Sequence, residues 1–192
     1  ATAKGIRDAA HAQIAAVMDV NEAMARDLAE AHGVPWTCDA ADLLARDDVD
    51  AVYIAVPHYL LAPLTIQAAR AGKHVLCEKP MATTLADADR MIAACAAAGV
   101  LLSIAFDAQI TPALRKLREL IAGGGIGELI GTRIVALIDK PQSYWSSGWT
   151  GRIATDWRTS KEKAGGGVLV MNGIHDINTV RFVTGLEARR VS

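Results

Sequence analysis

Residues 51–80 read AVYIAVPHYLLAPLTIQAARAGKHVLCEKP, and this stretch decides the fold. Residues 51–56 and 74–77 are two apolar runs without polar alternation, which is typical of strands buried on both faces of a parallel sheet. The segment between them is long enough for a helix, and Gly72 is placed to end that helix. The stretch therefore predicts a right-handed strand–helix–strand unit.

Strand-like runs alternate with helical segments on both sides of this unit. Asn21 is placed to cap a helix at 22–32 and Gly33 to end it, while Thr84 and Gly99 do the same for the helix after the unit. The predicted strands are residues 13–18, 36–38, 51–56, 74–77 and 100–106. This repetition predicts an α/β fold with a doubly wound parallel sheet of the Rossmann type.

The pattern changes after Asp107. The predicted elements there are a helix at 112–121, a strand at 131–138, a long polar and aromatic loop at 139–164, a helix from the triple glycine 165–167 to residue 184, and a strand that begins at 189. Long loops inside a compact domain are usually functional, so we expect ligand contacts from the aromatic loop.

The composition excludes several classes of protein. The 192 residues are 52% hydrophobic and 21% charged, as in an ordinary globular α/β protein. The formal net charge of -1 provides no basic surface for nucleic acid or an anionic membrane, and no apolar run approaches the ~20 residues of a membrane span. Cys38, Cys77 and Cys95 are isolated and follow no metal or redox spacing, so we expect a cytoplasmic protein without a metal site.

Four residues fall at the carboxyl ends of two predicted strands, where ligands bind in such sheets. They are Pro57, His58, Glu78 and Lys79, which we assign to cofactor binding. Lys79 is also the main catalytic candidate, because Pro80 favours an extended backbone that aims its side chain into the crevice. A lysine there can polarise a substrate hydroxyl or carbonyl and exchange a proton if burial lowers its pKa. A surface lysine paired with Glu78 is the alternative.

Asp19 ends the predicted strand at 13–18. In a dinucleotide-binding sheet, a carboxylate at this position can accept hydrogen bonds from the adenosine ribose. A favourable acid at a helix N-terminus is the alternative, and the local sequence leaves both open. Val20 and Asn21 offer no positive charge for a 2′-phosphate, so NAD is the expected cofactor and NADP is less favoured.

His175 lies on the helix behind the triple glycine, where the backbone can approach a ligand or a neighbouring sheet closely. Histidine can shuttle a proton near neutral pH, and a core histidine bonded to the backbone is the alternative. Trp145, Trp149 and Trp157 present flat apolar faces that can stack on a sugar ring or cover the sheet.

Taken together, these residues resemble the Gfo/Idh/MocA family, the group of glucose–fructose oxidoreductase, inositol dehydrogenase and rhizopine catabolism proteins. The motifs that carry the resemblance are AVYIAVPH at 51–58, AGKHVLCEKP at 71–80, Gly127-Glu128, Asp156-Trp157-Arg158, and Gly165-Gly166-Gly167 through Gly173-Ile174-His175. The resemblance implies a Rossmann domain followed by an α/β domain built on an open sheet, both incomplete. We expect residues 1–107 to form the first domain without its first strand and glycine loop, and residues 108–192 to begin the second.

The resemblance also implies NAD(P)-linked oxidation or reduction of sugars, polyols and related alcohols. It implies catalytic roles for Lys79 and His175, cofactor contacts from Trp157 and Arg158, and substrate contacts from Asn172, Trp145 and Trp149. The expected partner is a small-molecule substrate, and the full-length protein is expected to be a homo-oligomer.

Several positions depart from the family pattern. At the end of the strand predicted at 51–56, Val56-Pro57-His58 stands where the family has Thr-Pro-Asn. Met171 stands where the family usually has Asp four residues before the histidine, and Asn178 stands where it has Asp three residues after. Because a Met side chain cannot transfer a proton, Lys79 and His175 are expected to divide the proton chemistry, with Asn172 orienting the substrate. A dinucleotide-binding or regulatory protein without turnover is the alternative function.

Overall fold

The computed structural model describes residues 2–148 and 154–191. Within these ranges, parallel strands form two small sheets. One sheet pairs β1 (Val17–Met18) with β2 (Trp36–Thr37), and the other has the order β3 (Ala51–Ile54), β4 (His74–Cys77), β5 (Leu102–Ile104). The register places Ala51 beside His74 and Val75 beside Leu102. The strand–helix–strand unit predicted over residues 51–77 is confirmed.

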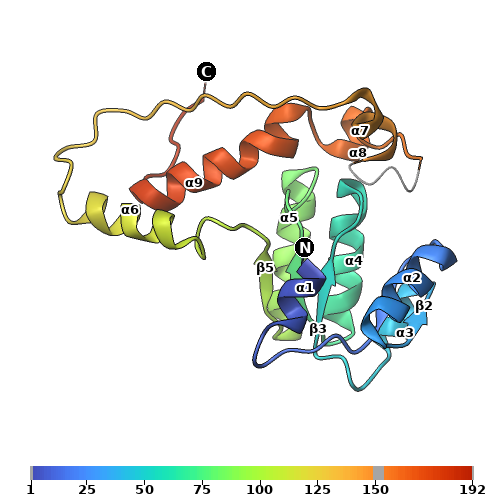
Figure 1. Cartoon of the computed structure of the whole chain (residues 1–192). Helices are drawn as coiled ribbons and strands as arrows, with labels where there is room; N and C mark the ends of the chain where they lie inside the picture. The colour runs from blue at the N-terminus through green and yellow to red at the C-terminus, as the bar shows by residue number, and fades with distance from the viewer. Residues whose placement is uncertain (1, 149–153, 192) are drawn as a thin grey trace.

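Helices alternate with these strands, and the elements described after β5 are helices. The first group is α1 (Thr2–Arg7), α2 (Glu22–His32), α3 (Ala40–Leu44), α4 (His58–Arg70) and α5 (Leu85–Ala98). The second group is α6 (Pro112–Ala122), α7 (Gln142–Ser147), α8 (Lys161–Ala164), the π-helical segment η1 (Leu169–Gly173) and α9 (Ile174–Thr184). Figure 1 shows α4 and α5 standing side by side, with α6 and α9 packed on each other at the other end of the molecule.

The predicted caps are confirmed at both long helices. Asn21 Oδ1 accepts a hydrogen bond from the backbone N–H of Met24 at 3.2 Å, and Gly33 ends α2 with a φ of 67°. Thr84 Oγ1 accepts from the backbone N–H of Asp87 at 3.1 Å, at the start of α5. Such a cap contributes about 1 kcal/mol by satisfying an N–H group that the first helical turn leaves open.

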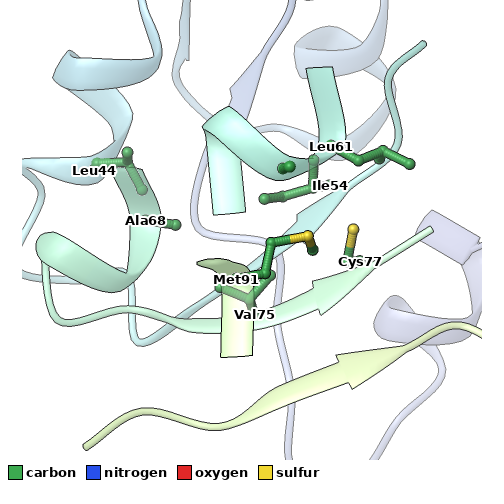
Figure 2. Packing of buried hydrophobic residues seen from close by; sticks show 8 residues of the cluster. Leu44, Ile54, Leu61, Ala68, Val75, Cys77 and Met91 are labelled. Atoms are coloured by element: carbon green, nitrogen blue, oxygen red, sulfur yellow. The ribbon is translucent and has the colours of Figure 1, made fainter. Parts of the chain in front are cut away.

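One face of the three-stranded sheet makes the main core against α4 and α5 (Figure 2). Its buried members are Leu44, Ile54, Leu61, Ala62, Ala68, Val75, Cys77 and Met91. Burial raises the pKa of the Cys77 thiol to about 11. Tyr53 and Leu76, on the opposite face, are only half-buried, so the expected burial of both faces is realised on one. The core fixes the positions of β3 and β4, and with them the residues that follow each strand.

The strand predicted at 131–138 is wrong: these residues have no regular structure. Figure 1 shows them in the long extended segment that crosses from α6 to α7. Val135 and Leu137 are 69% and 94% exposed. A strand needs a neighbour for its backbone hydrogen bonds, and in the described ranges no strand lies beside this segment.

Three smaller expectations also need correction. The strand at 13–18 is reduced to Val17–Met18, and residues 189–191 are irregular, with Ser192 outside the described residues. The loop predicted at 139–164 contains two short helices, α7 and α8. Among the helices described, none is long and apolar enough to span a bilayer.

Candidate active site

Lys79 lies at the carboxyl end of β4 and reaches across to the second half of the chain. Its Nζ donates a hydrogen bond to the carbonyl oxygen of Met171 at 2.7 Å. Burial lowers the pKa of Lys79; the Glu78 charge partly opposes this shift and the Lys140 charge adds to it. The site therefore holds a half-buried lysine whose ammonium group loses its proton more readily than that of a surface lysine.

Glu78 is held by other groups. The hydroxyl of Tyr53 donates to Glu78 Oε1 at 2.5 Å, and the backbone N–H of Lys79 donates to Glu78 Oε2 at 3.2 Å. The ammonium group of Lys79 bonds to Met171 instead, so the surface Glu–Lys pair that the sequence left open is not what forms. The Lys79–Pro80 peptide bond is cis.

Met171 lies in the π-helical segment η1, a type of distortion that is frequent at functional sites. Its side chain is 2% exposed and packs in a second buried cluster with Trp157 and Ala164, against which Trp145 also packs. The Met171 side chain is therefore part of the core, while its backbone carbonyl accepts the hydrogen bond from Lys79. Its neighbour Asn172 has a buried Oδ1 that finds no hydrogen-bond partner in the part of the chain that the structure describes.

His58 connects the start of α4 to α8. Its Nδ1 lies 2.8 Å from the carbonyl oxygen of Ala164 and must donate the hydrogen bond, since the carbonyl can only accept. Its ring centroid lies 4.4 Å from that of Trp157. Burial lowers the pKa of His58; the bond to Ala164 partly opposes this shift, and the charges of Lys79 and Arg158 add to it. His58 is thus a buried connection between α4 and α8, and its predicted contact with the cofactor stays a prediction.

Arg158 is held between aromatic rings. Its Cζ lies 4.4 Å from the ring centroid of Trp157 and 5.0 Å from that of Tyr144, while Lys140 Nζ lies 4.5 Å from the Tyr144 centroid. Lys140 and Tyr144 were not predicted as site residues. Lys140 is the second residue after the run 131–138, so its place after an expected strand was the signal that could have found it.

His175 lies beside the end of β5, on the first turn of α9. Its Nδ1 is 3.9 Å from Asp107 Oδ1, and its ring packs edge-on to Phe106 with 5.9 Å between centroids. The His175 side chain is 41% exposed, so it is not the core histidine that the sequence left open. Asp107 was also missed as a site residue, although it follows a predicted strand directly.

The triple glycine lets η1 approach the loop after Pro80. A Cβ at Gly165 would lie 2.9 Å from Thr83 Cα, and the φ of Gly165 is 78°. In the described residues, the close approach at Gly165 is to the backbone of a loop and not to a strand of the sheet. This contact places η1 over the end of β4, where the carbonyl of Met171 meets Lys79.

The other predicted site residues lie as follows. Asp19 directly follows β1 of the separate two-stranded sheet, and its Oδ1 accepts a hydrogen bond from the backbone N–H of Asn21 at 2.8 Å. Pro57 precedes α4 at the end of β3, and Trp145 lies against the buried cluster of Trp157 and Met171. Trp149 falls outside the described residues. Within those residues, no group of three His, Cys, Asp or Glu side chains is placed to hold a metal ion.

Comparison with known proteins places this geometry in a family. Residues 2–106 match the family described as "Oxidoreductase family, NAD-binding Rossmann fold", and residues 114–192 match the "GFO/IDH/MocA C-terminal domain". The 1,5-anhydro-D-fructose reductase of Ensifer adhaerens is 35% identical over 172 residues, which are 89% of this chain and 49% of that protein. The myo-inositol 2-dehydrogenase of Thermotoga maritima is 30% identical over 177 residues, 92% of this chain and 48% of that protein.

Solved structures give the same assignment. The aldose-aldose oxidoreductase from Caulobacter crescentus, complexed with glycerol, matches with a TM-score of 0.78 and 30% identity over 96% of this chain and 53% of that one. The WlbA dehydrogenase from Bordetella pertussis, in complex with NADH and UDP-GlcNAcA, has a TM-score of 0.81 and 26% identity over 98% and 56%. The chain spans about half the length of the curated relatives that it matches. With both family domains matched, the chain belongs to the Gfo/Idh/MocA oxidoreductase family and has its NAD-binding Rossmann fold.

Proposed function

We propose that the full-length protein is an NAD-dependent dehydrogenase or reductase that acts on the CH–OH or carbonyl group of a sugar, a polyol or a related alicyclic compound. The observation that carries this proposal is the half-buried Lys79, with its lowered pKa, bonded to the carbonyl of Met171 at the carboxyl edge of a parallel sheet. Ligands of such sheets bind at that edge. The names of the reductase and dehydrogenase relatives support the same chemistry.

Each residue at this edge has a role in the proposal. The nicotinamide, when bound, accepts or donates the hydride. During oxidation, His175 accepts the substrate hydroxyl proton and the Lys79 ammonium stabilises the developing negative charge on that oxygen. The unpartnered Asn172 Oδ1 accepts a hydrogen bond from a second substrate hydroxyl, which relieves the cost of leaving a buried acceptor unsatisfied. Trp145 and Trp149 supply apolar faces for the substrate ring.

The cofactor contacts are proposed from the ends of the parallel strands. Asp19 accepts from the adenosine ribose, Pro57 and Glu78 line the crevice, and Trp157 and Arg158 approach from the second half of the chain. In the described residues β1 pairs with β2, and β3, β4 and β5 form a second parallel sheet. We propose that both sheets belong to one Rossmann domain. This domain is proposed to end at residue 107 and the second to begin at 108.

The full-length protein is also proposed to be a cytoplasmic homo-oligomer. Exposed apolar side chains of the segment before α7, such as Ile130 at 99% exposure, support an assembly that covers them. Light scattering of the purified full-length protein measures its mass directly. A monomeric mass at micromolar concentration would contradict the oligomer.

Turnover of the full-length protein tests the function. The absorbance of reduced nicotinamide is followed with NAD and a panel of sugars and polyols, and with NADH and the corresponding carbonyl compounds. We expect turnover with at least one member of the panel and its loss in Lys79→Met. Tight NAD binding without turnover in either direction would instead indicate a non-catalytic dinucleotide-binding protein.

A further inference from the structure

We propose that Tyr53 is a positioning residue for Lys79: its hydroxyl holds the Glu78 carboxylate away from the Lys79 ammonium group, so that the two charges do not form an ion pair. The inference rests on the proposed function, in which Lys79 acts on the substrate, and it adds a residue to that site. Tyr53 lies on β3, the strand next to the one that Lys79 follows, and acts through Glu78 rather than on the substrate itself.

The first observation is a hydrogen bond between the two strands. The Tyr53 hydroxyl donates to Glu78 Oε1 at 2.5 Å. This distance is typical of a hydroxyl that donates to an ionised carboxylate, which is one of the stronger kinds of hydrogen bond in proteins. The other oxygen, Oε2, accepts from the backbone N–H of Lys79 at 3.2 Å. Both oxygens of Glu78 therefore have a partner, and neither of these partners is the Lys79 ammonium group.

The second observation is the place of these side chains on the sheet. β3 and β4 are parallel neighbours, with Tyr53 beside Leu76. The backbone N–H of Glu78 donates to the carbonyl oxygen of Ile54 at 2.9 Å, so the hydrogen-bond ladder extends one residue beyond β4. Because side chains alternate between the two faces along a strand, Leu76 and Glu78 lie on the face of Tyr53. The Tyr53 hydroxyl thus meets Glu78 on the face opposite to the main core.

The third observation concerns the groups around the Lys79 ammonium. Its Nζ donates to the carbonyl oxygen of Met171 on η1 at 2.7 Å. Burial lowers the pKa of Lys79, the charge of Glu78 partly opposes this shift, and the charge of Lys140 adds to it. His58, on α4, is a further titratable group that interacts electrostatically with Lys79. Of these three groups Glu78 alone is an acid, so its distance from Lys79 determines how far the lowering of the pKa is opposed.

A shorter distance between Glu78 and Lys79 would impair both roles of the lysine. The attraction between opposite charges grows as they approach and is stronger where water is excluded. A Glu78 carboxylate released from Tyr53 can turn toward the ammonium group, which would raise the pKa of Lys79 and offset the positive charge offered to the substrate oxygen. The hydroxyl of Tyr53 thus helps Lys79 to release a proton and to stabilise negative charge.

The test measures the chemistry of the Lys79 amine in the full-length protein without cofactor or substrate. Acetic anhydride at low concentration acetylates an amine in its neutral form, and mass spectrometry gives the rate at Lys79 as a function of pH. The internal reference is Lys73, because its Nζ also donates to a backbone carbonyl, that of Arg46 at 2.8 Å.

We expect Tyr53→Phe to lower the rate at Lys79, relative to Lys73, by about threefold at about pH 8, because a smaller fraction of the Lys79 amine is then neutral. Tyr59→Phe, at an exposed position on α4, is the matched control and should leave this ratio unchanged. An unchanged ratio in Tyr53→Phe would overturn the proposal.

A second background shows whether Tyr53 acts through Glu78. Glu78→Gln keeps the shape of the side chain and an acceptor for the tyrosine hydroxyl but removes the charge. We expect Glu78→Gln to raise the rate at Lys79, and we expect Tyr53→Phe to have no further effect in that background. An equal fall of the rate with and without the Glu78 charge would mean that the hydroxyl acts on Lys79 by another route, and the proposal would be wrong.

Activity separates this inference from the proposed function. If a substrate is turned over, the limb of the pH–rate profile that reports Lys79 should move toward higher pH in Tyr53→Phe, with the Kd for NAD within about twofold of wild type. A Tyr53→Phe protein whose only defect is weaker NAD binding would instead assign Tyr53 and Glu78 to the cofactor and overturn the proposal. If no substrate is turned over, the proposed function fails, while the acetylation rates still decide the role of Tyr53.

Discussion

Lys79 Nζ donates a hydrogen bond to the carbonyl oxygen of Met171 at 2.7 Å, and this bond joins the end of β4 to the π-helical segment η1. The partner is neutral, so the bond orients the ammonium group without the strong stabilisation of charge that a carboxylate would give. Burial lowers the pKa of this lysine, and Glu78 only partly opposes the shift. The inert side chain of Met171 is thus compatible with a catalytic role for Lys79, because Lys79 uses only the backbone carbonyl of Met171.

Close packing at Gly165 gives the first prediction. Gly165→Ala should lower the free energy of unfolding more than Gly72→Ala. Both glycines have positive φ values, 78° and 74°, so alanine costs about 1 kcal/mol of backbone strain at either. Only at Gly165 would the new Cβ lie 2.9 Å from Thr83 Cα, and we expect this clash to cost a further 1–3 kcal/mol or so. Urea unfolding of both variants measures the difference, and equal destabilisation would contradict the close approach.

The sequence predicts those elements of the fold that depend only on residues close together in the chain. The apolar runs at 51–56 and 74–77 and the glycine at 72 are sufficient for β3, α4 and β4. The run at 131–138 has the same strand-like composition, but a strand also requires partners that are distant in sequence, and among the residues that the structure describes no strand lies beside it. Composition shows the tendency of a segment to form a strand but not whether a neighbouring strand is present.

The same limit applies to the site. Lys79 was predicted from its place at a strand end, and Asp107 could have been found by the same argument. The acceptor for Lys79 could not, because a backbone carbonyl carries no residue-specific signal and becomes available only through the irregular helix at η1. The meeting of Lys140 and Arg158 at Tyr144 depends on tertiary packing in the same way.

Acid should destabilise the fold through His58. Its pKa is lowered, mainly by burial, so the unfolded chain binds more protons than the folded one once the pH drops below the ordinary histidine pKa of about 6.5. The stabilisation is present above that pH and is lost as the pH falls through the folded pKa. Denaturant unfolding between about pH 5 and 7 should show this loss, and His58→Gln should reduce it. His11→Gln, at an exposed position, is the control. An unchanged pH dependence in His58→Gln would rule out His58 as the cause.

Asp19 is expected to set the cofactor preference. A carboxylate repels a 2′-phosphate by about 1 kcal/mol at ~4 Å in water and by more where water is excluded, while it accepts a hydrogen bond from a free ribose hydroxyl. The full-length protein should bind NAD roughly tenfold or more tighter than NADP, and Asp19→Ser should narrow this gap. Asp27→Ser, on the exposed surface of α2, should leave it unchanged. Titration of each protein with NAD and with NADP measures both Kd values. A wild-type protein that binds NADP tighter than NAD would be incompatible with this role of Asp19.

The imidazole of His175 should matter more for turnover than the amide of Asn172. His175 lies 3.9 Å from Asp107 and can exchange a proton, whereas Asn172 can only position the substrate. We expect His175→Ala to lower kcat by roughly 10²-fold or more, and Asn172→Ala to act mainly on KM. Steady-state kinetics of both variants measure kcat and KM separately. A larger fall of kcat in Asn172→Ala would show that the proton is handled elsewhere.

The most direct test of the account compares two lysines that donate to backbone carbonyls. Lys79 Nζ bonds to Met171 O at the carboxyl edge of the sheet, and Lys73 Nζ bonds to Arg46 O at 2.8 Å just before β4 begins. The measurement is kcat together with the Kd for NAD in full-length Lys79→Met and Lys73→Met. Lys79→Met should lower kcat by roughly 10²-fold or more with the Kd for NAD within about twofold of wild type, and Lys73→Met should leave both near wild type. A Lys79→Met enzyme with wild-type kcat, or one whose defect lies only in NAD binding, would contradict the assignment of Lys79 to turnover.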